Sequence, residues 1–75
     1  MRCLDIKLNG LESVRECVNI ANQYPYYIAL RQGRAVVDAK SLLGICSLDQ
    51  TLPVTVDAYS DHTHDLFEAL SKYAC

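Results

Sequence analysis

The order of apolar periods along the chain limits its fold more than any other feature of the sequence. Segments 2–8 and 54–59 carry apolar residues at every second position, the period of strands that are buried on one face. Segments 26–31 and 35–37 are rich in β-branched and aromatic residues, and they flank a glycine-containing loop of hairpin length. These patterns predict four strands, two of which form a hairpin.

A helical pattern follows the first of these strands. Ser13 stands three residues before Glu16, which is the spacing of a capping box at a helix N-terminus. The helix is expected to end near Gln23, because Pro25 disfavours helical geometry in the residue before it. Its apolar stripe is formed by Val14, Cys17, Val18 and Ala21.

The stretch KSLLGICSL, residues 40–48, is largely apolar but does not alternate. Ser41 can accept a backbone N–H as a helix N-cap, so we expect a helix of about two turns here, weakened by Gly44. A last helix is expected to be capped by Ser60 or Asp61. Its apolar stripe contains Leu66, Phe67, Leu70, Tyr73 and Ala74.

The resulting order is strand, helix, strand, strand, helix, strand, helix within 75 residues. A chain of this length forms one small domain, so residues 1–75 are expected to share a single core. The predicted sheet has only one strongly apolar side, which all the helices must therefore cover. The predicted fold class is α+β, a two-layer open-faced sandwich with a four-stranded sheet and three helices on one face.

Composition argues against several classes of protein. The chain is 51% hydrophobic, which is typical of a globular fold and too apolar for disorder. The net charge of −2, without a basic stripe, argues against direct binding of nucleic acid. No apolar run approaches the ~20 residues of a membrane span, and no signal-peptide core is present, so a cytoplasmic protein without membrane contact is expected.

The residues that often carry chemistry show no catalytic or metal-binding pattern. The four cysteines include no CxxC pair, so we expect reduced thiols packed as small hydrophobes, with a disulfide framework as the alternative. In DHTHD, residues 61–65, His62 and His64 are two apart and do not share a helix face, so no more than weak metal binding is expected there. No nucleophile has a local base, and the expectation is a non-enzyme without metal or cofactor.

One segment and the element order resemble a known family. Residues 39–48, AKSLLGICSL, with the strand and helix that follow, resemble HPr, the histidine-containing phosphocarrier of the bacterial sugar phosphotransferase system. The segment NGLESVREC, residues 9–17, then falls where that family has its active-site loop. The resemblance covers essentially the whole chain and implies a single HPr-like domain.

The loop that carries the family's chemistry departs from the family pattern. In HPr it reads Gly-Leu-His-x-Arg-Pro-Ala, and its histidine accepts phosphate from enzyme I and passes it on. Here Gly10 and Leu11 are followed by Glu12 and Ser13, with no histidine in the first half of the chain. The resemblance therefore implies a degenerate active-site loop and a lost phosphocarrier reaction, as in catabolite-repression HPr.

Ser41 matches the regulatory serine that a dedicated kinase phosphorylates in many members of the family. The resemblance implies a protein partner, either such a serine kinase or a transcriptional regulator of carbon metabolism. It places the partner-binding residues at Leu42, Leu43 and Cys46. The alternative is that Ser41 only caps the helix and that the two leucines belong to the core.

Two other functions stay open from the sequence. The chain could be a phosphocarrier-type component that uses a non-standard residue, with His62 and His64 as the only histidines available. It could also be a purely structural domain that forms a homodimer.

Overall fold

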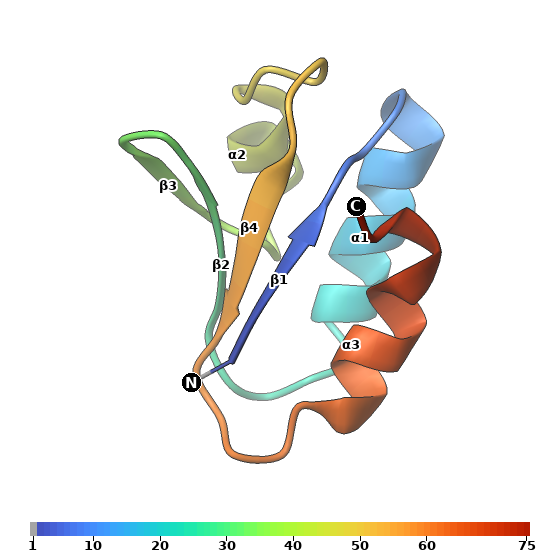
Figure 1. The fold of residues 1–75 in the computed structure, drawn as a ribbon, viewed down its shortest axis with the longest axis vertical. Coiled ribbons are helices and arrows are strands. Elements are labelled where there is room, and N and C mark those ends of the chain that lie inside the picture. Colours follow the sequence, from blue (N-terminus) through green and yellow to red (C-terminus); the bar gives the residue numbers. More distant parts are fainter. Residues whose placement is uncertain (1) are drawn as a thin grey trace.

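The computed structural model describes residues 2–75, and its elements follow the predicted order (Figure 1). Four strands form one layer and three helices the other, which confirms the open-faced α+β sandwich. No helix within residues 2–75 is long and apolar enough to cross a bilayer. The elements are β1 (Arg2–Ile6), α1 (Leu11–Ala21), β2 (Ile28–Gln32), β3 (Ala35–Asp38), α2 (Leu42–Cys46), β4 (Val54–Ala58), α3 (His64–Leu70) and a 3-10 turn, η1 (Ser71–Tyr73).

The sheet is entirely antiparallel, with the strand order β1-β4-β2-β3. Val56 of the central strand β4 stands opposite both Leu4 and Leu30, so these side chains share the face that the helices cover. The alternation predicted for β4 is confirmed, because Val54, Val56 and Ala58 are all buried. This face and the helices enclose one core; its fully buried members include Ile6, Ile28, Leu30, Ile45, Leu66 and Leu70.

The other face of the sheet carries no helix, and a polar cluster covers its centre. The Asp57 carboxylate accepts hydrogen bonds from Nε and a terminal nitrogen of Arg31, at 2.9 and 3.2 Å, and from Sγ of Cys3 at 3.1 Å. Arg31 holds the pKa of Asp57 below its usual range, so the carboxylate stays charged although it is buried. The alternation of apolar and polar residues in β4 does not predict this burial, because it assigns Asp57 to the face of the sheet that no helix covers.

The start of α1 differs from the capping-box prediction, which was wrong. The helix begins at Leu11, and Gly10 is the N-cap with φ 87° and ψ 169°. Ser13 is buried inside the first turn, where its hydroxyl donates to the Gly10 carbonyl and accepts from the Asn9 N–H, both at 2.8 Å. Glu16 is therefore free to bond elsewhere.

Replacing Gly10 with alanine is expected to lower the free energy of unfolding by about 1–3 kcal/mol, because its dihedral angles are essentially restricted to glycine. Crowding would not contribute, since no atom lies within 4 Å of an added Cβ. Urea denaturation measures the loss, with Asn9→Ala as the neighbouring control, whose exposed side chain makes no described hydrogen bond. Equal stabilities of the two variants would rule out backbone strain at Gly10.

The last helix also begins later than predicted. Thr63 is its N-cap and α3 starts at His64, whereas Ser60 accepts a hydrogen bond from the His62 N–H in the preceding loop. Thr63 is almost fully buried, so packing rather than side-chain capping sets this boundary. Leu66 and Leu70 lie in the core as predicted.

Candidate protein-docking surface

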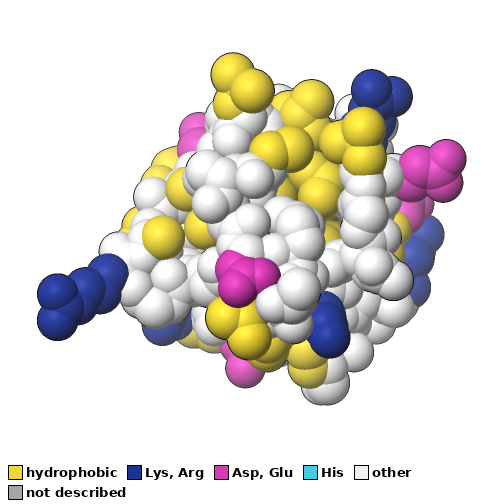
Figure 2. All heavy atoms as spheres, turned by 90° about the horizontal axis from the view of Figure 1, so that it is seen from above, with side chains coloured by type: hydrophobic (Ala, Val, Ile, Leu, Met, Phe, Trp, Pro, Cys, Tyr) yellow, Lys and Arg dark blue, Asp and Glu magenta, His cyan; other side chains and the backbone are white. Residues whose placement is uncertain are grey.

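The N-terminus of α1 and the short helix α2 meet at one end of the molecule. Leu43 is 84% exposed and Leu11 is 53% exposed, and Leu42 and Cys46 are also exposed. Figure 2 looks down on this end and shows hydrophobic side chains gathered around a hollow. We call these four residues and the hollow between them the α1–α2 surface.

The hollow has a volume of about 240 Å³, and its walls are largely apolar. Gln50 forms its one polar wall: the amide nitrogen donates to the carbonyls of Ile45 and Leu48, at 3.1 and 3.3 Å. The amide oxygen of Gln50 is buried and has no hydrogen-bond partner among the described residues. The hollow is lined by Gly10, Leu11, Val14, Cys46 and Gln50.

The local sequence of α2 explains why its leucines face outward. Ser41 is the N-cap, and its hydroxyl accepts the Gly44 N–H at 3.1 Å, as predicted. Ile45 is the residue of this helix that enters the core, which leaves Leu42 and Leu43 on the outside. Cys46 is exposed as well.

Gly44, which weakens α2 by propensity, lies in a tightly packed position that favours glycine. An added Cβ would lie 3.3 Å from Oγ of Ser41 and 3.3 Å from Cβ of Val37 in β3. The glycine therefore lets the capped helix end approach the sheet. This contact fixes where α2 presents its two leucines.

Removing the cap is expected to cost stability without disturbing the core. Ser41→Ala should lower the free energy of unfolding by about 0.5–2 kcal/mol, because the Gly44 N–H loses its acceptor. Ser47→Ala is the matched control at the other end of α2, where an exposed hydroxyl donates to the Gly44 carbonyl, and it should change stability by less than about 0.5 kcal/mol. Equal losses in thermal or urea unfolding would contradict the capping role.

The segment Gly10–Ser13, which the resemblance predicts to be a degenerate active-site loop, borders the same hollow. Gly10 and Leu11 line it, whereas Glu12 is exposed in the first turn of α1 and brings a negative charge there. Both hydrogen bonds of the Ser13 hydroxyl are internal to the turn, with the Asn9 N–H and the Gly10 carbonyl, so neither described bond joins it to a basic side chain. The geometry thus gives Ser13 a structural role rather than that of a nucleophile.

The two histidines lie at the opposite end of the molecule, in the loop between β4 and α3 and at the start of α3 (Figure 1). Nε2 of His64 is 3.1 Å from Oε2 of Glu68, an exposed pair on one helix face, and His62 is exposed in the loop. The fold therefore separates both histidines from the Gly10–Ser13 loop. In residues 2–75 no group of three His, Cys, Asp or Glu side chains is placed to hold a metal ion.

The cysteines are all free thiols, and only Cys17 is buried. Burial raises the pKa of Cys17 to about 11, so its thiol stays protonated near neutral pH and is a poor nucleophile. Cys3 lies on the open face of the sheet, where its hydrogen bond to Asp57 raises its pKa.

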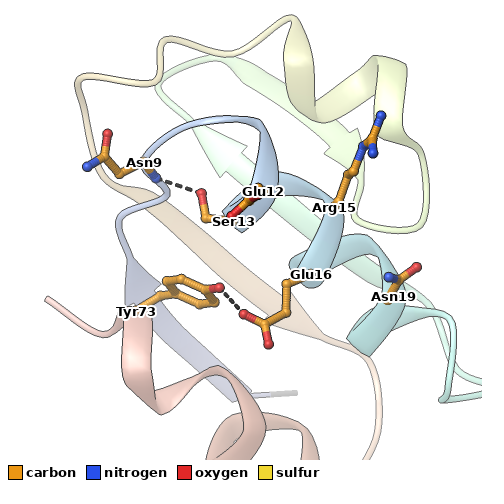
Figure 3. A pocket seen from close by; sticks show the side chains of 7 residues that line it. All are labelled: Asn9, Glu12, Ser13, Arg15, Glu16, Asn19 and Tyr73. Carbon is orange, nitrogen blue, oxygen red and sulfur yellow. Dashed lines mark hydrogen bonds between the residues drawn. The ribbon is translucent and has the colours of Figure 1, made fainter.

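A polar hollow lies on the flank of α1, next to the α1–α2 surface (Figure 3). There the Glu16 carboxylate accepts hydrogen bonds from Nζ of Lys72, at 2.8 Å, and from the Tyr73 hydroxyl. Both donors lower the pKa of Glu16, and the carboxylate raises the pKa of Tyr73 to about 12. Sequence reasoning assigned Tyr73 to an apolar stripe and missed this link, which joins residues more than fifty positions apart and ties α1 to η1.

The link predicts a pH dependence of stability. The pKa of Glu16 in the folded state lies below its ordinary value of 4.5. The hydrogen bonds to Lys72 and Tyr73 therefore stabilise the fold fully above pH 4.5. This stabilisation is lost as the pH falls through the pKa of Glu16 in the folded state. Glu16→Gln should therefore lose less stability than the wild type between pH 5 and pH 3 (approximate limits). Urea midpoints across this range measure the effect, and parallel curves for the two proteins would refute it.

Comparisons with known proteins support the fold assignment. No protein-family profile and no curated protein sequence match the chain. In structure, the chain is similar to HPr-C-His from Thermoanaerobacter tengcongensis, with a TM-score of 0.79 and 25% sequence identity over 96% of this chain and 89% of that chain. The fold of this chain is therefore HPr-like.

Proposed function

We propose that the chain is a non-catalytic, HPr-like regulatory module related to the carbohydrate phosphotransferase system, and that it binds a protein partner through the α1–α2 surface. The observation that carries this proposal is the exposure of Leu43 and Leu11 beside an apolar hollow. Apolar groups gathered on a surface mark interaction sites when they lie together rather than singly. The surface lies where the phosphocarrier loop falls by sequence resemblance, so it serves docking after the loss of phosphotransfer.

A protein fits this surface better than a small molecule. The hollow of about 240 Å³ lies below the ~300–1,000 Å³ typical of small-molecule pockets. Much of the exposed apolar area belongs to leucines that project beside the hollow, and contiguous exposed apolar surface of this kind marks protein interaction sites.

Capture from cell extract tests the docking site when two exposed apolar residues are compared. Leu11→Asp changes the α1–α2 surface, and Tyr59→Asp introduces the same charge at a comparably exposed side chain that follows β4 at the opposite end of the molecule. A partner that binds as proposed is retained by the wild type and by Tyr59→Asp but lost from Leu11→Asp. Equal retention by both variants would show that binding uses another face.

Regulation through Ser41 is the second part of the proposal. A phosphate there adds about −1.5 to −2 charges at pH 7 next to Leu42 and Leu43, and would alter the docking surface directly. The partner would be an HPr serine kinase, and the phosphorylated form would bind a transcriptional regulator of carbon metabolism. Ser41 is only partly buried, and its hydroxyl accepts one described hydrogen bond, from the Gly44 N–H. A kinase would therefore have to break only this bond to reach the hydroxyl.

A kinase assay tests this regulation. The protein is incubated with a bifunctional HPr kinase and ATP, and phosphate is located by mass spectrometry. We expect modification of the wild type and of Ser47→Ala but not of Ser41→Ala. An unmodified wild type, beside a labelled HPr control, would reject the regulatory part while leaving the docking proposal open to its own test.

Incubation with phosphoenolpyruvate and enzyme I tests the phosphocarrier alternative. We expect no acid-labile phosphate, because both histidines lie far from the end that carries the degenerate loop. A label on His62 or His64, lost in the corresponding asparagine variant, would replace the proposed function with phosphotransfer.

A further inference from the structure

Of the two edge strands of the sheet, β1 is covered by another segment of the chain, and β3 is not paired on its outer side by any described residue. The free edge of β1 is covered by the C-terminal residues: the Lys7 N–H donates to the Tyr73 carbonyl at 2.9 Å, and the Cys75 N–H to the Asp5 carbonyl at 3.0 Å. At the other edge lies β3, at the left margin of Figure 1, and no described segment pairs with its outer side. An uncovered edge strand presents unpaired backbone groups to a further strand.

The backbone of Val36 points to this open edge. The Ala39 N–H donates to the Ile28 carbonyl, which makes these residues a hydrogen-bonded pair of the β2–β3 ladder. Because bonded and non-bonded pairs alternate in antiparallel sheets, Val36, opposite Arg31, belongs to a non-bonded pair. Its N–H and C=O are therefore directed away from β2, and no turn or side-chain hydrogen bond within residues 2–75 uses them.

The strand β3 is short, but its three apolar residues carry neither a proline nor a charge that would block pairing. Ala35, Val36 and Asp38 are exposed, and Val36 is 57% exposed. No proline or charged residue stands between Arg34 and Asp38. Arg34 is exposed as well, and it forms no ion pair with any described residue.

We propose that a second copy of the chain pairs with β3 in antiparallel register, with Val36 on the two-fold axis. Val36 then faces Val36 of the second copy as a bonded pair that exchanges two backbone hydrogen bonds. Ala35 faces Val37 of the second copy, and Arg34 faces Asp38 of the second copy, on both sides of the axis. The edge is thus complementary to itself in hydrogen bonding, in apolar contact and in charge, as a two-fold interface requires.

The interface is small, and this sets how it must be measured. A strand of four residues buries less than the ~1,200 Å² of a standard stable interface, so the dimer forms at high concentration and exchanges rapidly. The dimer is tested by variants of β3 and its flanking charges, whereas the docking proposal is tested by variants of Leu11 and Leu43 in the helix layer. Failure of the dimer and failure of the proposed docking function are therefore separate results.

Charge exchange tests the register. Arg34→Asp and Asp38→Arg each place like charges opposite one another in the homodimer, and each should raise the dimer Kd about tenfold or more. In a mixed dimer the first variant carries two acidic side chains at these positions and the second carries two basic ones. Opposite charges then face each other on both sides of the axis, so the mixture should associate at least as tightly as the wild type. Arg15→Asp makes the same charge change on the exposed face of α1, away from β3, and should dimerise like the wild type.

Sedimentation equilibrium with reductant, from about 10 µM to about 1 mM, measures these constants. Asp38 also accepts the Lys40 N–H at 2.8 Å, so circular dichroism confirms that Asp38→Arg is folded. Val36→Lys is a further variant that does not alter Asp38. It would place two lysines opposite one another on the two-fold axis, so this variant should be monomeric. A wild type that is monomeric at every concentration, a dimer indifferent to these variants, or no association in the mixture would each overturn the proposal.

Discussion

Replacing Ile45 with alanine is expected to destabilise the fold by about 2–4 kcal/mol, a large share of the ~4–11 kcal/mol expected for a domain of this length. Ile45 is fully buried and is the residue of α2 that enters the core. A five-residue helix has no stability of its own, so this contact and the Ser41 cap hold α2 in place. Urea denaturation with an unchanged m-value measures the loss.

Leu43→Ala is the matched control for this variant, because Leu43 lies on the same helix and is 84% exposed. It should change stability by less than about 0.5 kcal/mol. Ile45→Val, with an expected loss of about 0.5–1.5 kcal/mol, keeps the comparison measurable if the alanine variant is largely unfolded. A loss below about 1 kcal/mol for Ile45→Ala would mean that α2 is not anchored through this side chain.

Leu43→Asp is expected to weaken binding of the protein partner by about thirtyfold or more, the loss typical of a central interface residue. The charge would have to be desolvated against an apolar surface. The fold should be unaffected, because an exposed aspartate in the first turn of α2 is compatible with the helix dipole. Titration of the captured partner by calorimetry gives the affinity.

Tyr59→Asp again serves as the control, since it introduces the same charge at the end of the molecule opposite the α1–α2 surface. Its affinity for the partner should stay within about threefold of the wild type. If the two variants bind equally well, Leu43 is not part of the interface.

The sequence predicted the strands and the short helix because their signals are local. The alternation in 54–59 and the serine ahead of Leu42 each specify structure within a few residues. The start of α1 was mispredicted for the same reason: Ser13 and Glu16 have capping-box spacing, but Glu16 bonds instead to η1 at the other end of the chain. Gly44 could not be explained locally either, because Val37 of β3 limits the space around it.

The candidate site was predictable in its parts but not as an assembled surface. Resemblance to a family pointed to Leu43 and Cys46 in one segment and to Leu11 in another. Only the fold shows that Leu11 and Cys46 line the same hollow and that Gln50 forms its polar wall. Exposure of Leu42 and Leu43 was equally undetermined, because apolar residues of a short helix can face either the core or a partner.

Photo-cross-linking from position 43 tests directly whether a partner protein docks on the α1–α2 surface. A benzophenone side chain replaces Leu43 in one protein and Tyr59, at the opposite end of the molecule, in the other, and both are irradiated in cell extract. We expect a discrete cross-linked protein from position 43 that is absent from position 59. No adduct from position 43, or the same adducts from both positions, would contradict a docking function for this surface.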